Sequence, residues 1–80
     1  MTKIPDSARL RVIVDGVGIY CKRSQIPSIF ATTRHHYAAE WAIQQIEASR
    51  NMPDMRSCMG FAGRHFSQRF APVDVQVDLL

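Results

Sequence analysis

The sequence has few of the features that mark secreted or membrane proteins. It holds only two cysteines, Cys21 and Cys58, whereas a disulfide-built secreted domain of this size usually has more. We therefore expect both thiols to be reduced and mostly buried. No apolar run approaches the roughly 20 residues that a membrane span requires. The first residues, MTKIPDSARLR, contain no apolar signal segment, so we expect a cytoplasmic protein that does not bind membranes.

Motifs for catalysis and metal binding are missing as well. The chain has no G-K-[ST] phosphate loop, no nucleophile elbow and no H-E-x-x-H zinc motif. His35 and His36 are neighbours that would point about 100° apart on a helix. Cys58 and His65 would lie about 10 Å apart along a helix, which is too far to share one ion. The sequence therefore predicts a protein that is not an enzyme and that has no metal or cofactor site.

The composition that is present is typical of a folded domain with an uneven charge. Hydrophobic residues make up 46% of the chain and charged residues 21%, which excludes a disordered protein. Residues 1–36 carry six basic and two acidic side chains, whereas residues 37–80 carry four basic and five acidic ones. The excess of positive charge in the first half is compatible with a polyanionic partner but does not require one.

The strongest local signal is a β-hairpin in residues 9–23, RLRVIVDGVGIYCKR. Asp15-Gly16 between two β-rich runs favours a two-residue type I′ turn, and that turn fixes the register of the strands. One face of the hairpin then carries an apolar ladder, made of Leu10, Val12, Val14, Val17, Ile19 and Cys21. The opposite face gathers cations around one tyrosine. We call this set, with the adjoining arginine, the basic patch: Arg9, Arg11, Tyr20, Lys22 and Arg23.

The rest of the chain predicts further helices and strands. Residues 34–50 lack glycine and proline, so we expect a helix there. Residues 73–79 alternate strictly between apolar and polar types, which indicates a half-buried strand. A short third strand is expected near residues 29–32. Apolar spacing also favours a helix near residues 54–62, although each of two glycines would cost about 1 kcal/mol in its interior. Whether this helix continues beyond residue 62 stays open.

The order of these elements predicts an α+β fold. We expect a small antiparallel sheet, made of the N-terminal hairpin, the third strand and the C-terminal strand, with two helices packed on one face. A chain of 80 residues can build one core but not two, so residues 1–80 should form a single domain.

The predicted helix over residues 34–50 has an aliphatic side and an opposite side that carries its tryptophan. Its aliphatic side should pack on the sheet and consists of Ala39, Ala42, Ile43 and Ile46. The opposite side carries Tyr37, Trp41, Gln44 and Ala48. Two interpretations of this second side stay open. Either the C-terminal half of the chain covers Trp41, or the side is an interface, since Trp and Tyr anchor interfaces more often than other residues.

The first functional hypothesis is a non-enzymatic binding protein. It would contact a protein through Tyr37, Trp41, Gln44 and Ala48 and act as an accessory protein or stoichiometric inhibitor of a larger complex, one that handles nucleic acids. Phage and mobile-element proteins that antagonise host defence, such as anti-CRISPR proteins, are one group of small chains that work in this way. The comparison with them is an analogy of size that no specific residue carries.

Two alternatives accompany this hypothesis. The basic patch could bind RNA or single-stranded DNA directly, with Tyr20 stacking on a base while the cations hold phosphates. A homodimer could instead form through the side of the helix that carries Trp41, which would leave the hairpin as the working surface.

Overall fold

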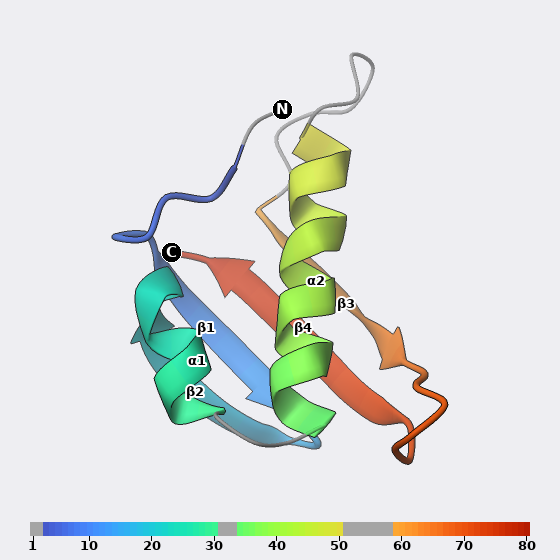
Figure 1. Ribbon diagram of the computed structural model, residues 1–80. Coiled ribbons are helices and arrows are strands. Elements are labelled where there is room, and N and C mark those ends of the chain that lie inside the picture. Colours follow the sequence, from blue (N-terminus) through green and yellow to red (C-terminus); the bar gives the residue numbers. More distant parts are fainter. Residues whose placement is uncertain (1–2, 31–33, 51–58) are drawn as a thin grey trace.

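A four-stranded antiparallel sheet forms one layer of the structure, and both helices lie against the same face of it (Figure 1). The computed structural model describes residues 3–30, 34–50 and 59–80. The elements, in chain order, are β1 (Arg9–Val14), β2 (Val17–Lys22), the 3-10 turn η1 (Arg23–Gln25), α1 (Ile26–Ile29), α2 (Arg34–Arg50), β3 (Gly60–His65) and β4 (Val73–Leu79). The strand order is β2-β1-β4-β3, which makes β2 and β3 the edges. The predicted α+β class is therefore confirmed.

The N-terminal hairpin has the predicted register. Asp15 and Gly16 have φ angles of 49° and 85°, the two positive values that a type I′ turn requires. Val14 pairs with Val17 next to the turn, and Arg9 pairs with Lys22 at the other end. The apolar ladder consequently lies on the inner face of the sheet, the face that the helices cover. The basic side chains of β1 and β2 lie on the outer face.

The C-terminal strand is also confirmed, and it takes a central place in the sheet. β4 pairs antiparallel with β1 on one side and with β3 on the other. Val73, Val75 and Val77 point inward and are at most 3% exposed. Full burial of such a side chain stabilises the folded state by about 1.5–3 kcal/mol, so these valines are a main support of the core.

The predicted third strand is wrong, because residues 26–29 form a helical turn instead. Pro27 stands in the first turn of α1, where its missing N–H group has no helical partner to lose. Ile26 and Phe30 point into the core. Residues 31 and 32, the remainder of the predicted strand, lie outside the described residues.

The predicted helix near residues 54–62 is wrong at its C-terminal end. Residues 60–65 form the edge strand β3. Every second residue of this strand, Phe61, Gly63 and His65, lies on the inner face. Long-range pairing with β4 satisfies this backbone, whereas a helix would have had to accommodate both glycines. Residues 54–58 lie outside the part of the chain that the structure describes.

The long helix α2 packs on the sheet through small and branched side chains. Ala38, Ala39, Ala42, Ile43 and Ile46 are at most 1% exposed. The alanines let the helix axis approach the sheet closely, and the isoleucines fill the space on either side. The predicted aliphatic side of the helix is confirmed. Among the described residues, no helix is long and apolar enough to cross a bilayer.

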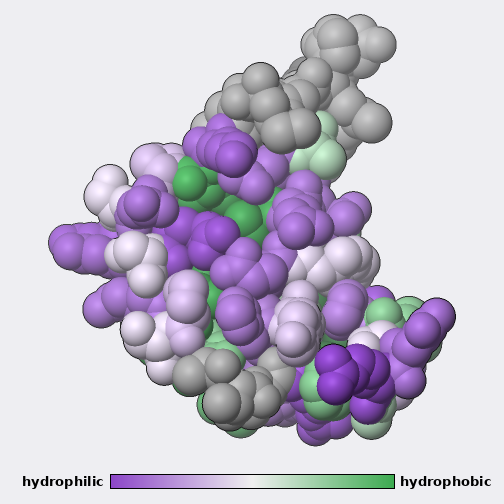
Figure 2. Space-filling model, in the orientation of Figure 1, coloured by the Kyte–Doolittle hydropathy of each residue, from purple (hydrophilic) through white to green (hydrophobic). Residues whose placement is uncertain are grey.

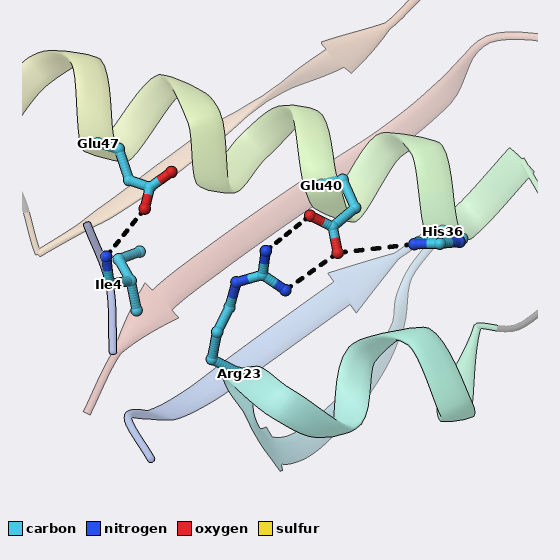
Figure 3. Close-up of polar contacts among 5 residues, drawn as sticks. All are labelled: Ile4, Arg23, His36, Glu40 and Glu47. Carbon is cyan, nitrogen blue, oxygen red and sulfur yellow. Dashed lines mark hydrogen bonds and ion pairs between the residues drawn. The ribbon is translucent and has the colours of Figure 1, made fainter. Parts of the chain in front are cut away.

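Two glutamates on one flank of α2 attach the N-terminal part of the chain to the helix (Figure 3). Glu40 accepts hydrogen bonds of 3.0 and 2.8 Å from the guanidinium of Arg23, and it lies 3.6 Å from His36 Nε2. Glu47 accepts a 2.9 Å hydrogen bond from the backbone N–H of the buried Ile4. Since this flank faces the N-terminal segment and η1, the opposite flank of α2 faces β3.

Candidate functional site

Trp41 packs against the inner face of β3. Its ring meets that of Phe61 edge to face, with centroids 5.1 Å apart and planes at 85°, and it lies 5.3 Å from the ring of His65. A Cβ atom on Gly63 would lie only 3.3 Å from Trp41 Cη2, so the glycine leaves room for the indole. Trp41 is partly buried and extends the core. The C-terminal half of the chain thus covers part of this side chain.

The other residues predicted on the same side of α2 remain accessible. Gln44 and Ala48 are exposed. Tyr37 is 54% exposed. Its ring stacks on Phe70, with centroids 5.8 Å apart and planes at 28°, and on His36 at the same separation. The structure therefore separates the predicted interface into a packed residue, Trp41, and an exposed group around Tyr37.

The ring of Tyr37 forms one wall of a pocket of about 280 Å³. We call this the aromatic pocket; it is lined by Tyr37, His65, Phe66, Ser67, Arg69 and Phe70. Most of the lining comes from the connection between β3 and β4, where Figure 2 shows hydrophobic residues beside strongly hydrophilic ones, at the lower right of the view. Phe66 is 71% exposed and Phe70 36% exposed.

The aromatic pocket has a positive rim. None of its lining residues is acidic. The backbone N–H of Arg69 donates to Ser67 Oγ at 3.1 Å, but its guanidinium forms no ion pair with any residue that the structure describes. Sequence reasoning missed Phe66, Arg69 and Phe70 as site residues because the helix predicted near residues 54–62 left the course of the chain beyond residue 62 open. The usable signal was the cluster FSQRFAP, which ends in a proline just before the last strand.

The basic patch is much less positive than its sequence indicates. Arg11 lies 2.6 Å from Asp78 Oδ2 and donates a second hydrogen bond to the same oxygen. This interaction with Asp78, together with Tyr20, raises the pKa of Arg11. Because β4 lies next to β1, the outward carboxylate of Asp78 reaches this cation of the hairpin. At the other end of β4, Asp74 pairs with Arg64 of the neighbouring strand β3, at 2.8 Å.

Arg23 does not join the other members of the basic patch. It points to the inner side of the sheet, where it pairs with Glu40 (Figure 3). Arg9 and Lys22 are then the members without an ion pair to any described residue. They line a shallow pocket of about 360 Å³ together with Tyr20, which is 71% exposed.

The tip of the hairpin is tied to the start of α2. Asp15 Oδ2 accepts a 2.9 Å hydrogen bond from Arg34 Nη2 and lies 3.0 Å from His35 Nε2. The backbone N–H of Asp15 donates to the carbonyl of Asp74 at 2.9 Å. The hydrogen bond with His35, and the charge of Arg34, lower the pKa of Asp15. These contacts occupy His35 and fix the turn against the helix.

Within residues 3–30, 34–50 and 59–80, no three side chains of His, Cys, Asp or Glu come together in a way that could hold a metal ion. Cys21 is a buried free thiol, and burial raises its pKa, which favours the unreactive neutral form. Cys58 lies outside the described residues.

Comparison with known proteins finds no family model, no curated protein and no solved structure that matches this chain. The function therefore has to be inferred from the surfaces described above.

Proposed function

We propose that this chain is a protein-binding domain whose contact surface is the aromatic pocket and the exposed side of α2 beside it. It acts in the cytoplasm as an accessory protein or stoichiometric inhibitor of a larger complex, without catalysing a reaction. The observation that carries this proposal is the gathering of Tyr37, Phe66 and Phe70 from two distant segments around one pocket that also holds Arg69. Aromatic residues and arginine are enriched at the energetic centres of protein interfaces.

The exposure of these rings supports a role outside the fold of this chain. Phe66 is 71% exposed, so burial of its ring contributes little to folding. Covering the ring with a partner would remove apolar area from water and release the corresponding free energy on binding. Stacking between Tyr37 and Phe70 holds the pocket walls in place before a partner arrives, which lowers the entropic cost of association.

Nucleic-acid binding through the basic patch has weaker support. Proteins that bind single strands combine several unpaired cations with aromatic platforms for successive bases. Here Arg11 and Arg23 are engaged by Asp78 and Glu40, and Tyr20 is the patch's single aromatic residue. Only Arg9 and Lys22 are left to contact phosphates, and two cations bind a phosphate backbone weakly.

The proposal is tested by capture of cellular proteins on immobilised variants of the chain. Phe66→Ser removes an aromatic ring from the pocket, and Tyr20→Ser removes an equally exposed ring from the basic patch, since both are 71% exposed. In a nuclease-treated lysate of the cells in which the protein is made naturally, the wild type and Tyr20→Ser should retain the same protein, and Phe66→Ser should lose it. Retention by Phe66→Ser, or loss with Tyr20→Ser alone, would contradict the proposal.

A further inference from the structure

The edge strand β3 presents backbone groups that no described strand pairs with. The N–H of Leu79 donates to the carbonyl of Met59 at 2.6 Å, and hydrogen-bonded pairs alternate along an antiparallel ladder. The pairs of Phe61 with Val77 and of Gly63 with Val75 are therefore hydrogen-bonded. It follows that the N–H and C=O groups of the alternate residues Ala62 and Arg64 point away from β4, on the side where the described residues form no further strand.

The opposite edge is less suited to receive a strand. The same alternation along β2 points the backbone groups of Gly18, Tyr20 and Lys22 away from β1. However, the N–H of Lys22 already donates to Gln25 Oε1 at 2.8 Å. The pocket at the end of β2 also contains Arg9 and Lys22 rather than a group of aromatic rings.

At β3, by contrast, the free backbone lies beside the proposed contact surface. The contacts of Trp41 with Phe61 and His65 hold one flank of α2 over the inner face of β3. Tyr37 is one helical turn from Trp41 on the same flank, and β3 continues at His65 directly into Phe66. A strand laid along β3 would therefore have one set of alternate side chains on the face of the sheet that carries α2, and it would end at the aromatic pocket.

The charges at this end define the chemistry of such a strand. No acidic residue lines the aromatic pocket, and the guanidinium of Arg69 has no ion pair with a described residue. The nearby Arg64 is already held by Asp74. A ligand that places a bulky apolar side chain in the pocket should therefore carry a carboxylate beside it, in position to pair with Arg69.

We infer that the protein partner binds as an extended acidic and apolar segment that adds a strand to the β3 edge. Main-chain hydrogen bonds to Ala62 and Arg64 hold the segment, and the aromatic pocket with Arg69 selects its sequence. This inference rests on the proposed function and specifies how the partner is recognised.

The test uses a phage-displayed library of seven-residue peptides selected on the full chain, followed by synthesis of the selected peptides. Ala62→Pro removes the outward N–H but no hydrogen bond to β4, and Gly18→Pro makes the same change on β2. The selected peptides should combine alternating apolar residues with Asp or Glu. Ala62→Pro should weaken their binding about tenfold or more, because one main-chain hydrogen bond is lost and the proline ring obstructs the edge. Gly18→Pro should bind within about twofold of the wild type.

Amide hydrogen exchange gives a second measurement that needs no variant. Exchange at Ala62 and Arg64 should slow in the complex, and exchange at Gly18 and Tyr20 should not change.

Wild-type affinity in Ala62→Pro together with unchanged exchange at Ala62 would overturn strand addition, while loss of binding in Phe66→Ser would still uphold the proposed function. Failure to select any peptide would overturn the inference but not the proposed function, whereas binding that is indifferent to Phe66→Ser would overturn both. If exchange at Ala62 and Arg64 slows in the free chain as its concentration rises, the β3 edge pairs with a second copy of the chain. That result would overturn the inference.

Discussion

The indole of Trp41 stands edge-on to the ring of Phe61, with centroids 5.1 Å apart, and this contact joins the long helix to an edge strand. Such a pair contributes about 0.5–1.5 kcal/mol beyond the area that it buries. The same contact places the flank of α2 that carries Tyr37 above β3. Trp41 thus positions the proposed binding surface, while the exposed rings of the aromatic pocket can contact a partner.

Replacement of Trp41 should destabilise the fold. Full truncation of a buried tryptophan costs about 3–5 kcal/mol, and for this partly buried ring we expect Trp41→Ala to lower the free energy of unfolding by about 2–3 kcal/mol. Urea unfolding followed by circular dichroism measures the change. A loss below about 0.5 kcal/mol, the range of ordinary surface substitutions, would mean that the indole is not part of the core.

Replacement of Phe66, unlike that of Trp41, should leave the stability of the fold almost unchanged. Because its ring is 71% exposed, Phe66→Ser should change the free energy of unfolding by no more than about 0.5 kcal/mol. The same urea experiment, run beside Tyr20→Ser, measures this. A loss above about 1.5 kcal/mol in Phe66→Ser alone would show that the ring supports the fold, and its effect on binding would then need another explanation.

The hairpin turn should make stability depend on pH. The pKa of Asp15 is lowered from its ordinary value of 3.8 by the hydrogen bond with His35 and the charge of Arg34. A carboxyl with a lowered folded-state pKa stabilises the fold above its unfolded pKa, and this contribution is lost as the pH falls through the folded value. Asp15→Asn keeps a residue that accepts positive φ in the turn but removes the charge.

The difference in unfolding free energy between the wild type and Asp15→Asn should therefore be largest at neutral pH. It should shrink as the pH falls below 3.8. Urea unfolding of both proteins at several pH values gives this difference directly. A difference that stays constant across the acid range would indicate that Asp15 acts through the shape of the turn rather than through its charge.

The ion pair between Arg11 and Asp78 should limit nucleic-acid binding by the basic patch. If only Arg9 and Lys22 contact phosphates, log affinity for single-stranded RNA should fall against log salt with a slope of about −1.4. Asp78→Asn frees Arg11, and the slope should steepen to about −2.1. Gel-shift titrations over a salt series measure both slopes. A wild-type slope near −2.8 would mean that all four cations of the basic patch bind phosphates, in favour of the nucleic-acid alternative.

Elements encoded by neighbouring residues could be predicted from the sequence. The Asp15-Gly16 turn determines the hairpin register through local backbone geometry, and the alternation of residues 73–79 specifies which side of the last strand is buried. The helix over residues 34–50 follows from an uninterrupted run of helix-forming residues. In each case the decisive interaction spans only a few positions in the chain.

Elements that depend on distant pairing could not be predicted. β3 is a strand because β4 pairs with it and Trp41 packs on Gly63, although its apolar spacing alone resembles that of a helix. The ion pair of Arg11 with Asp78 joins residues 67 positions apart, so the neutralisation of the basic patch depends on the strand order. The aromatic pocket likewise requires Tyr37 and Phe70 to meet across the fold.

The central claim is that a protein partner binds at the aromatic pocket rather than at the basic patch. The most direct measurement is an amide chemical-shift titration of the isotope-labelled chain with a peptide from the display selection. The largest shifts should occur at Tyr37, Phe66 and Phe70 and along the adjoining β3 edge. Shifts concentrated instead at Arg9, Tyr20 and Lys22 would contradict the account.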